Sequence, residues 1–164
     1  MTAKGKAAGG LMASAIKFLK RANRRNRPGR MRPWARDHVI GGGHVNAQGR
    51  GSGYHYRPGG QDFPGRRIIP GTKNVDTRTG AYTAEPEYWN PNGNPPGWVP
   101  KGGNNGVSSF FPDNWTAAEV DAAIPGAFRN AQPIGGNMWR GEYRNVVIEG
   151  YYHQGGLGHG WPVV

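Results

Sequence analysis

Hydrophobic positions near the start of the chain recur with the spacing of a helix. A helix over residues 7–23 would carry lysines on one face and apolar side chains near the other. The apolar positions are Leu11, Met12, Ile16 and Leu19. A basic run over residues 24–28, which closes on a proline, predicts the end of this helix.

A second helix is predicted to begin after Thr116. Thr116 followed three residues later by Glu119 is a capping box, in which each side chain bonds the backbone N–H of the other residue. Val120 and Ile124 supply an apolar face. The Pro-Gly pair at residues 125–126 predicts the end of the helix.

Short apolar and β-branched runs elsewhere predict strands separated by turns. They include a terminal hairpin, in which a Gly-Gly turn joins residues 145–152 to 159–164. Residues 85–106, rich in Pro, Asn and Gly, are expected to form a long polar loop. The other strands are expected at residues 66–70 and 80–83. Few helices among such strands indicate an α+β fold dominated by antiparallel pairing.

Composition narrows the fold further. Among 164 residues, 29 are Gly and 14 are Pro, about a quarter of the chain against roughly 12% in an average protein. This excludes a helical bundle and favours short strands and loops. The chain has no cysteine, so it has neither disulfides nor a thiolate metal site.

The positive charge is concentrated at the N-terminus. The net charge is +11, and residues 1–36 contain eleven Lys and Arg with no Asp or Glu. The remaining residues, 37–164, contain equal numbers of basic and acidic side chains and have no net charge. We therefore expect a basic N-terminal segment or linker at residues 1–33 and a neutral domain at 34–164. The basic segment suits phosphate contacts in a non-catalytic nucleic-acid-binding protein, or contact with an anionic membrane surface.

Three of the five histidines lie close together in a glycine-rich segment: His38, His44 and His55. Imidazole titrates near neutral pH, so one ring can accept a proton while another donates one. Two such rings at one phosphodiester would let a ribose 2′-hydroxyl attack its own phosphorus, without a metal or other cofactor. The other interpretations are loop histidines without function, or a metal site that also uses Asp37.

The residues resemble the bacterial EndoU-type endoribonucleases, including toxin domains of contact-dependent inhibition and other polymorphic toxin systems. The matching segments are His38-Val39-Ile40-Gly41, Gly53-Tyr54-His55, and Ser109-Phe110-Phe111-Pro112 leading into Trp115-Thr116. The resemblance covers about residues 34–164. It implies two small antiparallel sheets flanking a cleft, with a few helices.

By this resemblance, His38 and His55 are the catalytic acid–base pair, in an order that the sequence leaves open. Lys101 corresponds to the family's catalytic lysine, although six residues separate it from the serines that follow. Arg57 is the alternative cation. His44 lies between the pair and ranks below it as a substrate-binding residue.

Two further positions are implied to bind substrate. Ser109 corresponds to a polar residue near the base or phosphate, and its other interpretation is a structural strand residue. Trp161, in His159-Gly160-Trp161-Pro162, stands where the family often has tyrosine. Tryptophan can stack on a base but has no phenolic hydroxyl. Tyr151 and Tyr152 could compensate, or could belong to the core as Phe110 and Phe111 are expected to.

The resemblance implies an RNA endonuclease toxin that cleaves single-stranded RNA or tRNA to 2′,3′-cyclic phosphate ends. A producing cell must block its own nuclease, so the resemblance also implies a cognate immunity protein. The protein would be a monomer, secreted or delivered, that acts in the cytoplasm of a target cell.

Overall fold

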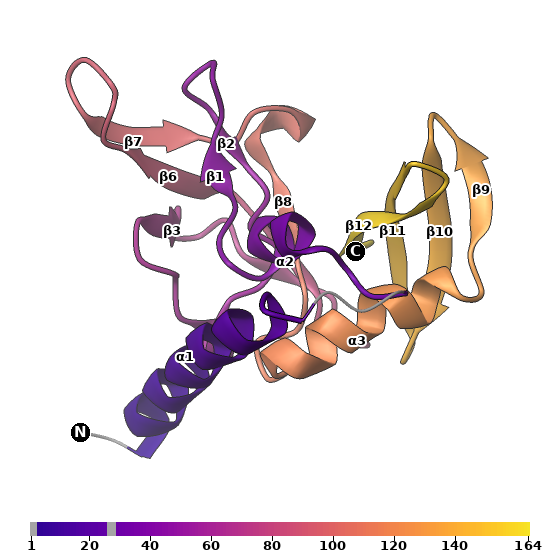
Figure 1. Ribbon diagram of the computed structural model, residues 1–164. Helices are drawn as coiled ribbons and strands as arrows, with labels where there is room; N and C mark the ends of the chain where they lie inside the picture. Colours follow the sequence, from indigo (N-terminus) through magenta and orange to yellow (C-terminus); the bar gives the residue numbers. More distant parts are fainter. Residues whose placement is uncertain (1–2, 26–28) are drawn as a thin grey trace.

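The computed structural model describes residues 3–25 and 29–164 (Figure 1). Within these residues the chain forms three α-helices, two short 3-10 helices and twelve short strands, so the expected α+β class is confirmed. The helices are α1 (Ala3–Ala22), α2 (Pro33–Val39) and α3 (Ala117–Phe128), with 3-10 helices η1 (Pro58–Gly60) and η2 (Asn104–Gly106). The strands are β1 (His44–Val45), β2 (Gly51–Ser52), β3 (Arg66–Ile68), β4 (Asn74–Val75), β5 (Tyr82–Ala84), β6 (Pro86–Asn90), β7 (Gly97–Pro100), β8 (Ser108–Phe110), β9 (Gln132–Gly135), β10 (Met138–Tyr143), β11 (Val146–His153) and β12 (Gly156–Pro162).

The described strands pair antiparallel in four small sheets. The largest has the order β12-β11-β10-β9, and the others are β1-β2, β3-β6-β7 and β4-β5-β8. Figure 1 shows the four-stranded sheet on one side of α2, and β1, β2, β6 and β7 on the other. The short helix α2 therefore lies where the two halves of the fold meet, in contact with β12.

The terminal hairpin forms as expected, and two strands extend it. β11 and β12 are antiparallel, with Tyr151 directly opposite His159. The chain turns through Gln154 and Gly155, both at positive φ. β10 and β9 were not expected from the sequence, yet β10 places Trp139 fully buried beneath the sheet.

Helix α3 begins as predicted and ends later than predicted. The capping box is present: Thr116 accepts a hydrogen bond from the Glu119 N–H, and Glu119 accepts one from the Thr116 N–H. The prediction that residues 125–126 end the helix was wrong, because α3 continues to Phe128. A proline removes its own N–H bond, but packing can hold the next turn. Here Gly126 lies against the ring of Tyr143, with no room for a side chain.

The prediction of a long loop at residues 85–106 was also wrong. This segment contains the hairpin of β6 and β7, in which Trp89 faces Trp98 across the strands. Tyr88 on β6 is fully buried, and its hydroxyl donates a hydrogen bond to the Gly53 carbonyl. The prolines in this segment lie at strand ends or between the strands, where a missing N–H costs no ladder bond.

Helix α1 spans Ala3–Ala22 and packs on the domain. Ala15 is buried, and Met31 beyond the helix is fully buried in the same cluster as α3 residues such as Val120. The helix ends before Arg24, and residues 26–28 of the expected basic terminus lie outside the described part. No helix among the described residues is both long enough and apolar enough to cross a membrane.

A buried ion pair ties α2 to α3. The Arg36 Nε lies 2.8 Å from the Asp121 Oδ1, and both side chains are less than 5% exposed. Pro33 occupies the first turn of α2, where a missing N–H is tolerated. This pair fixes the helix that carries His38.

Candidate functional site

A pocket of about 710 Å³ lies between the two halves of the fold. Its walls come from α2, β8, β11 and β12, and from the segments that follow β2 and β7. Five residues singled out from the sequence line it: His38, His55, Lys101, Ser109 and Trp161. Residues far apart in the chain thus meet in one cavity.

Backbone contacts join the two histidine segments. The His38 carbonyl accepts a hydrogen bond from the Tyr54 N–H at 2.7 Å, and the Val39 carbonyl accepts one from the His55 N–H at 3.0 Å. Gly53 has a φ of +80°, and a Cβ there would collide with the His38 carbonyl. Glycine at this position therefore permits the close approach that brings the two histidines together.

The residue before His55 has an unusual backbone conformation. Tyr54 is fully buried at a φ of +75°, a region that costs a bulky residue on the order of 1–3 kcal/mol. Its hydroxyl donates to Asp62, 2.5 Å away, and its N–H is bonded to His38. These contacts hold Tyr54 in place and so fix the direction in which His55 points.

The His55 ring is oriented by strand β8. Its Nδ1 lies 2.7 Å from the carbonyl oxygen of Ser109, which can only accept, so Nδ1 carries the proton. In the neutral ring, Nε2 is then the free acceptor. The His38 and His55 ring centroids are 6.1 Å apart, and both rings line the pocket, so both can contact one bound group.

Lys101 is held beside this pair. Its Nζ donates a hydrogen bond to the Ser108 Oγ at 3.1 Å, and the Ser108 hydroxyl donates to the Tyr54 carbonyl at 3.0 Å. The same Oγ lies 3.3 Å from Nδ1 of His55. The six-residue gap between Lys101 and the serines contains η2, which brings the two ends together across the pocket rim.

Burial dominates the electrostatics of the site. It lowers the pKa of Lys101 to about 8. Burial, with the nearby His159 and other basic groups, lowers the pKa of His38 to about 3. Burial together with Lys101 lowers the pKa of His159 to about 4 and holds that of His55 well below 6.5. The rings are therefore neutral near pH 7 and can accept protons when an anion binds.

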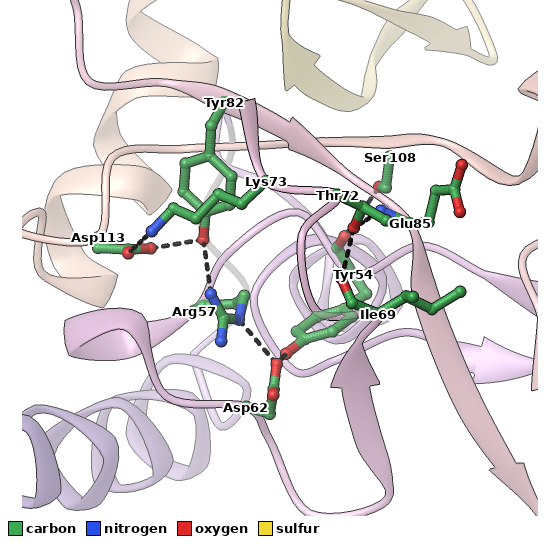
Figure 2. A network of polar contacts seen from close by, with 10 residues as sticks. All are labelled: Tyr54, Arg57, Asp62, Ile69, Thr72, Lys73, Tyr82, Glu85, Ser108 and Asp113. Carbon is green, nitrogen blue, oxygen red and sulfur yellow. Dashed lines mark hydrogen bonds and ion pairs between the residues drawn. The ribbon is translucent and has the colours of Figure 1, made fainter. Parts of the chain in front are cut away.

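Two of the residues chosen from the sequence lie outside the pocket. Arg57 is buried away from the pocket in the network shown in Figure 2, where its Nε is 2.7 Å from Asp62 and its Nη1 is 3.4 Å from the Tyr82 hydroxyl. His44 lies on β1 with its ring centroid 6.0 Å from that of His38, but it does not line the pocket. Lys101 is thus the cation that the fold brings to the histidines.

The structure adds one residue that sequence reasoning did not assign to the site. His159 lines the pocket, as does Tyr151, and the His159 ring centroid is 4.5 Å from that of His38. The Nδ1 of His159 is buried and has no hydrogen-bond partner among the described residues. The period of a strand could have found it, because His159 and Trp161 are two residues apart on β12 and so share one face.

Trp161 lines the pocket beside the rings of His55 and Tyr151. Its ring lies 6.2 Å from the His55 ring at an interplanar angle of 27°, and 5.5 Å from the Tyr151 ring. Tyr152, in contrast, packs on Phe128 on the core side of the sheet. Tyr151 is therefore the tyrosine that accompanies Trp161 in the pocket.

The histidines are not gathered as metal ligands. Within residues 3–25 and 29–164, no group of three or more His, Asp or Glu side chains is placed to hold a metal ion. The geometry instead combines neutral imidazoles with one ammonium group, which is suited to acid–base chemistry on an anionic substrate.

Comparison with known proteins gives two matches. A family model described as bacterial EndoU nuclease matches residues 34–163. A protein named Toxin from Bacillus cereus (strain ATCC 14579) is 33% identical over 112 residues, which cover 68% of this chain and 18% of the relative's length. The chain thus spans less than a fifth of that relative. No solved structure matches the chain.

Proposed function

The chain belongs to the bacterial EndoU nuclease family, and we propose that it is a metal-independent RNA endonuclease that acts as a toxin domain. The observation that carries the proposal is the meeting of His38, His55 and Lys101 in one pocket. The family match supports the nuclease activity, and the relative named Toxin supports the biological role.

In the proposed reaction, His55 is the base and His38 the acid. Nε2 of His55 accepts the proton of the ribose 2′-hydroxyl, and O2′ forms a bond to phosphorus. The bond from phosphorus to O5′ breaks, and protonated His38 donates its proton to O5′. The products are a 2′,3′-cyclic phosphate and a 5′-hydroxyl.

The surroundings of the two rings favour this order. Burial and the positive charge of Lys101 both oppose protonation of the His55 ring. It therefore stays unprotonated and able to accept a proton. His38 is partly exposed to the pocket, where a bound phosphate would favour its protonated form. Lys101 would stabilise the charge of the phosphorane.

The substrate is RNA because DNA lacks the attacking 2′-hydroxyl. Trp161 offers a stacking surface for the base beside the scissile phosphate, and Ser109 offers a hydroxyl. The body of the protein has no net charge, so the basic residues of positions 1–36 would assist capture of RNA through phosphate contacts.

A toxin of this kind requires a cognate immunity protein in the producing cell. We expect an acidic partner that covers the pocket between His38 and His55, and a delivery route that brings the nuclease into a target cell. Residues 34–164 would then carry the nuclease, with residues 1–33 as a basic segment able to contact nucleic acid or an anionic membrane. We expect the free protein to be a monomer.

The test is incubation of the full chain with tRNA and with total RNA in the presence of a chelator. We expect cleavage with cyclic phosphate ends and no cleavage of a 2′-deoxy strand. His38→Ala and His55→Ala should each lose about 10²–10⁴-fold in rate. Lys101→Ala should also lose activity, whereas the matched control Lys73→Ala, at a surface ion pair with Asp113, should not.

Intact RNA after incubation, or RNA binding without cleavage, would contradict the proposal. The second result would favour a non-catalytic nucleic-acid-binding protein. Its affinity would then fall steeply with salt and depend on residues 1–33.

A further inference from the structure

Trp34 lies beside the pocket without being part of its wall. It is the second residue of α2, one helical turn before His38, so the two side chains share a face of the helix. Trp34 is 44% exposed, although it is among the largest apolar side chains of the protein. The site described above makes no use of it.

Two histidines of the terminal hairpin hold the indole in place. The Trp34 ring centroid is 5.4 Å from that of His153 and 5.9 Å from that of His159, at interplanar angles of 61° and 86°. Edge contacts of this kind fix an aromatic ring while leaving part of its surface free. The indole is thus both positioned and open to solvent.

His159 connects Trp34 to the pocket. The His159 ring lies 4.5 Å from His38 on one side and 5.7 Å from Tyr151 on another. Aromatic rings therefore continue from Tyr151 and Trp161 inside the pocket, across His159, to Trp34 outside it. The scissile phosphate, placed at His38, would lie between the two ends of this row.

The spacing suits neighbouring nucleotides. Successive nucleotides are roughly 3.4 Å apart along a stacked strand and farther apart when the strand is extended. Two ring-to-ring steps, of 5.9 and 4.5 Å, lead from Trp34 to His38. A base attached to the nucleotide next to the scissile phosphate can therefore reach the indole. Arg32, exposed two residues earlier in the chain, adds a cation for the backbone.

We infer that Trp34 is a second base-stacking subsite, which binds the nucleobase on the far side of the scissile phosphate from the base held at Trp161. This inference rests on the proposed function. It predicts that the enzyme recognises at least two bases of a single strand, and that the base at Trp34 is bound by stacking, without selection for its identity.

The test uses a pentanucleotide with one central ribonucleotide and 2′-deoxy residues elsewhere, made in four versions, one for each base at the ribonucleotide. In matched strands the base is removed either from the ribonucleotide itself, whose 2′-hydroxyl is kept, or from the residue after it, because these two bases flank the scissile phosphate. For one of these two positions, we expect the wild-type full chain to lose about ten-fold in kcat/KM. Trp34→Ala should lose the same factor on the intact strand and show no further loss on the abasic strand. Trp34→Phe should retain most of the activity.

The matched control is Trp89→Ala. Trp89 is 41% exposed and packs against Trp98 on the β6–β7 hairpin, outside the pocket. This variant should behave as wild type. Thermal unfolding of each variant checks that it is folded.

The inference is overturned if Trp34→Ala cleaves the intact strand as wild type does, or keeps the full abasic penalty. If the wild type cleaves none of the strands, the proposed function fails instead. The subsite is then judged from Kd values for all-2′-deoxy strands, measured by fluorescence anisotropy. The Trp34→Ala and abasic losses in affinity should again not add.

Discussion

The Nζ of Lys101 donates a hydrogen bond to the Oγ of Ser108, 3.1 Å away. Because the Ser108 hydroxyl is itself bonded to the Tyr54 carbonyl, its free lone pairs face the lysine and His55. One buried serine thus links the ammonium group to the segment that carries the proposed base. We regard Ser108 as a positioning residue, since it does not line the pocket.

Ser108→Ala should lower kcat by about ten-fold or more, because the ammonium group would no longer be held at the site of the developing charge. Loss of the acceptor should also lower the pKa of Lys101 below about 8. A pH–rate profile would show this as an alkaline break at lower pH. Ser108→Thr, which keeps the hydroxyl, should restore both kcat and the position of the alkaline break. If Ser108→Ala lost activity while the break stayed at its wild-type pH, the assigned role would be contradicted.

The pH dependence of cleavage should contain a contribution from Lys101. Burial lowers its pKa to about 8, so the ammonium group is charged below that pH and neutral above it. kcat/KM should therefore fall more steeply with increasing pH above about pH 8. Lys101→Arg should remove this change of slope, because guanidinium keeps its charge. If the pH profile of Lys101→Arg were identical to that of the wild type, Lys101 would be excluded as the source of the change of slope.

The buried histidines should make the fold sensitive to acid. Their pKa values in the folded protein, about 3 for His38 and about 4 for His159, lie below the ordinary value near 6.5. At pH values between the folded and the ordinary pKa, the unfolded chain binds more protons than the folded protein. The free energy of unfolding therefore decreases as pH falls below 6.5. Urea denaturation at pH 7 and pH 5 measures the difference. His159→Asn should reduce it; an unchanged difference would refute the linkage.

Breaking the Arg36–Asp121 pair should strongly destabilise the protein. Removal of one partner of a buried pair leaves an uncompensated charge and typically costs 3–5 kcal/mol. Asp121→Ala should lower the free energy of unfolding by about that amount. Glu87→Ala, which breaks the more exposed pair with Arg67, should cost less than about 1 kcal/mol. Equal losses in the two variants would argue against this ranking.

Removal of residues 1–33 should lower Tm as well as net charge. The deletion takes away Ala15 and Met31, which are buried in the common core cluster. Loss of a fully buried methionine side chain alone costs about 2–5 kcal/mol. Differential scanning calorimetry of the full and shortened chains provides the measurement. An unchanged Tm would show that this segment is dispensable for folding.

Local patterns in the sequence were sufficient where the interaction itself was local. The Thr116–Glu119 capping box and the terminal hairpin are set by residues a few positions apart, and both are confirmed. The helix that carries His38 and the β6–β7 hairpin are held by distant partners. Arg36 bonds Asp121, and Tyr88 bonds Gly53, and in each pair the partners are far apart in the chain. No window of neighbouring residues therefore reveals these contacts.

The same distinction applies to the site. The two histidines were selected by their family resemblance, and the fold places both in one pocket. The resemblance favoured Lys101 as the catalytic cation and left Arg57 as the alternative. In the structure Asp62 and Tyr82 hold Arg57 outside the pocket, whereas Lys101 lines it.

The order in which the pocket walls occur along the chain has a consequence for synthesis. His38 and His55 belong to one early segment closed by its own backbone bonds, whereas His159 and Trp161 arrive on β12. A ribosome makes the chain from its N-terminus, so the nascent polypeptide has the imidazole pair long before it has the pocket wall that β12 supplies. The nuclease pocket is therefore finished only after β12 has been translated and has left the exit tunnel.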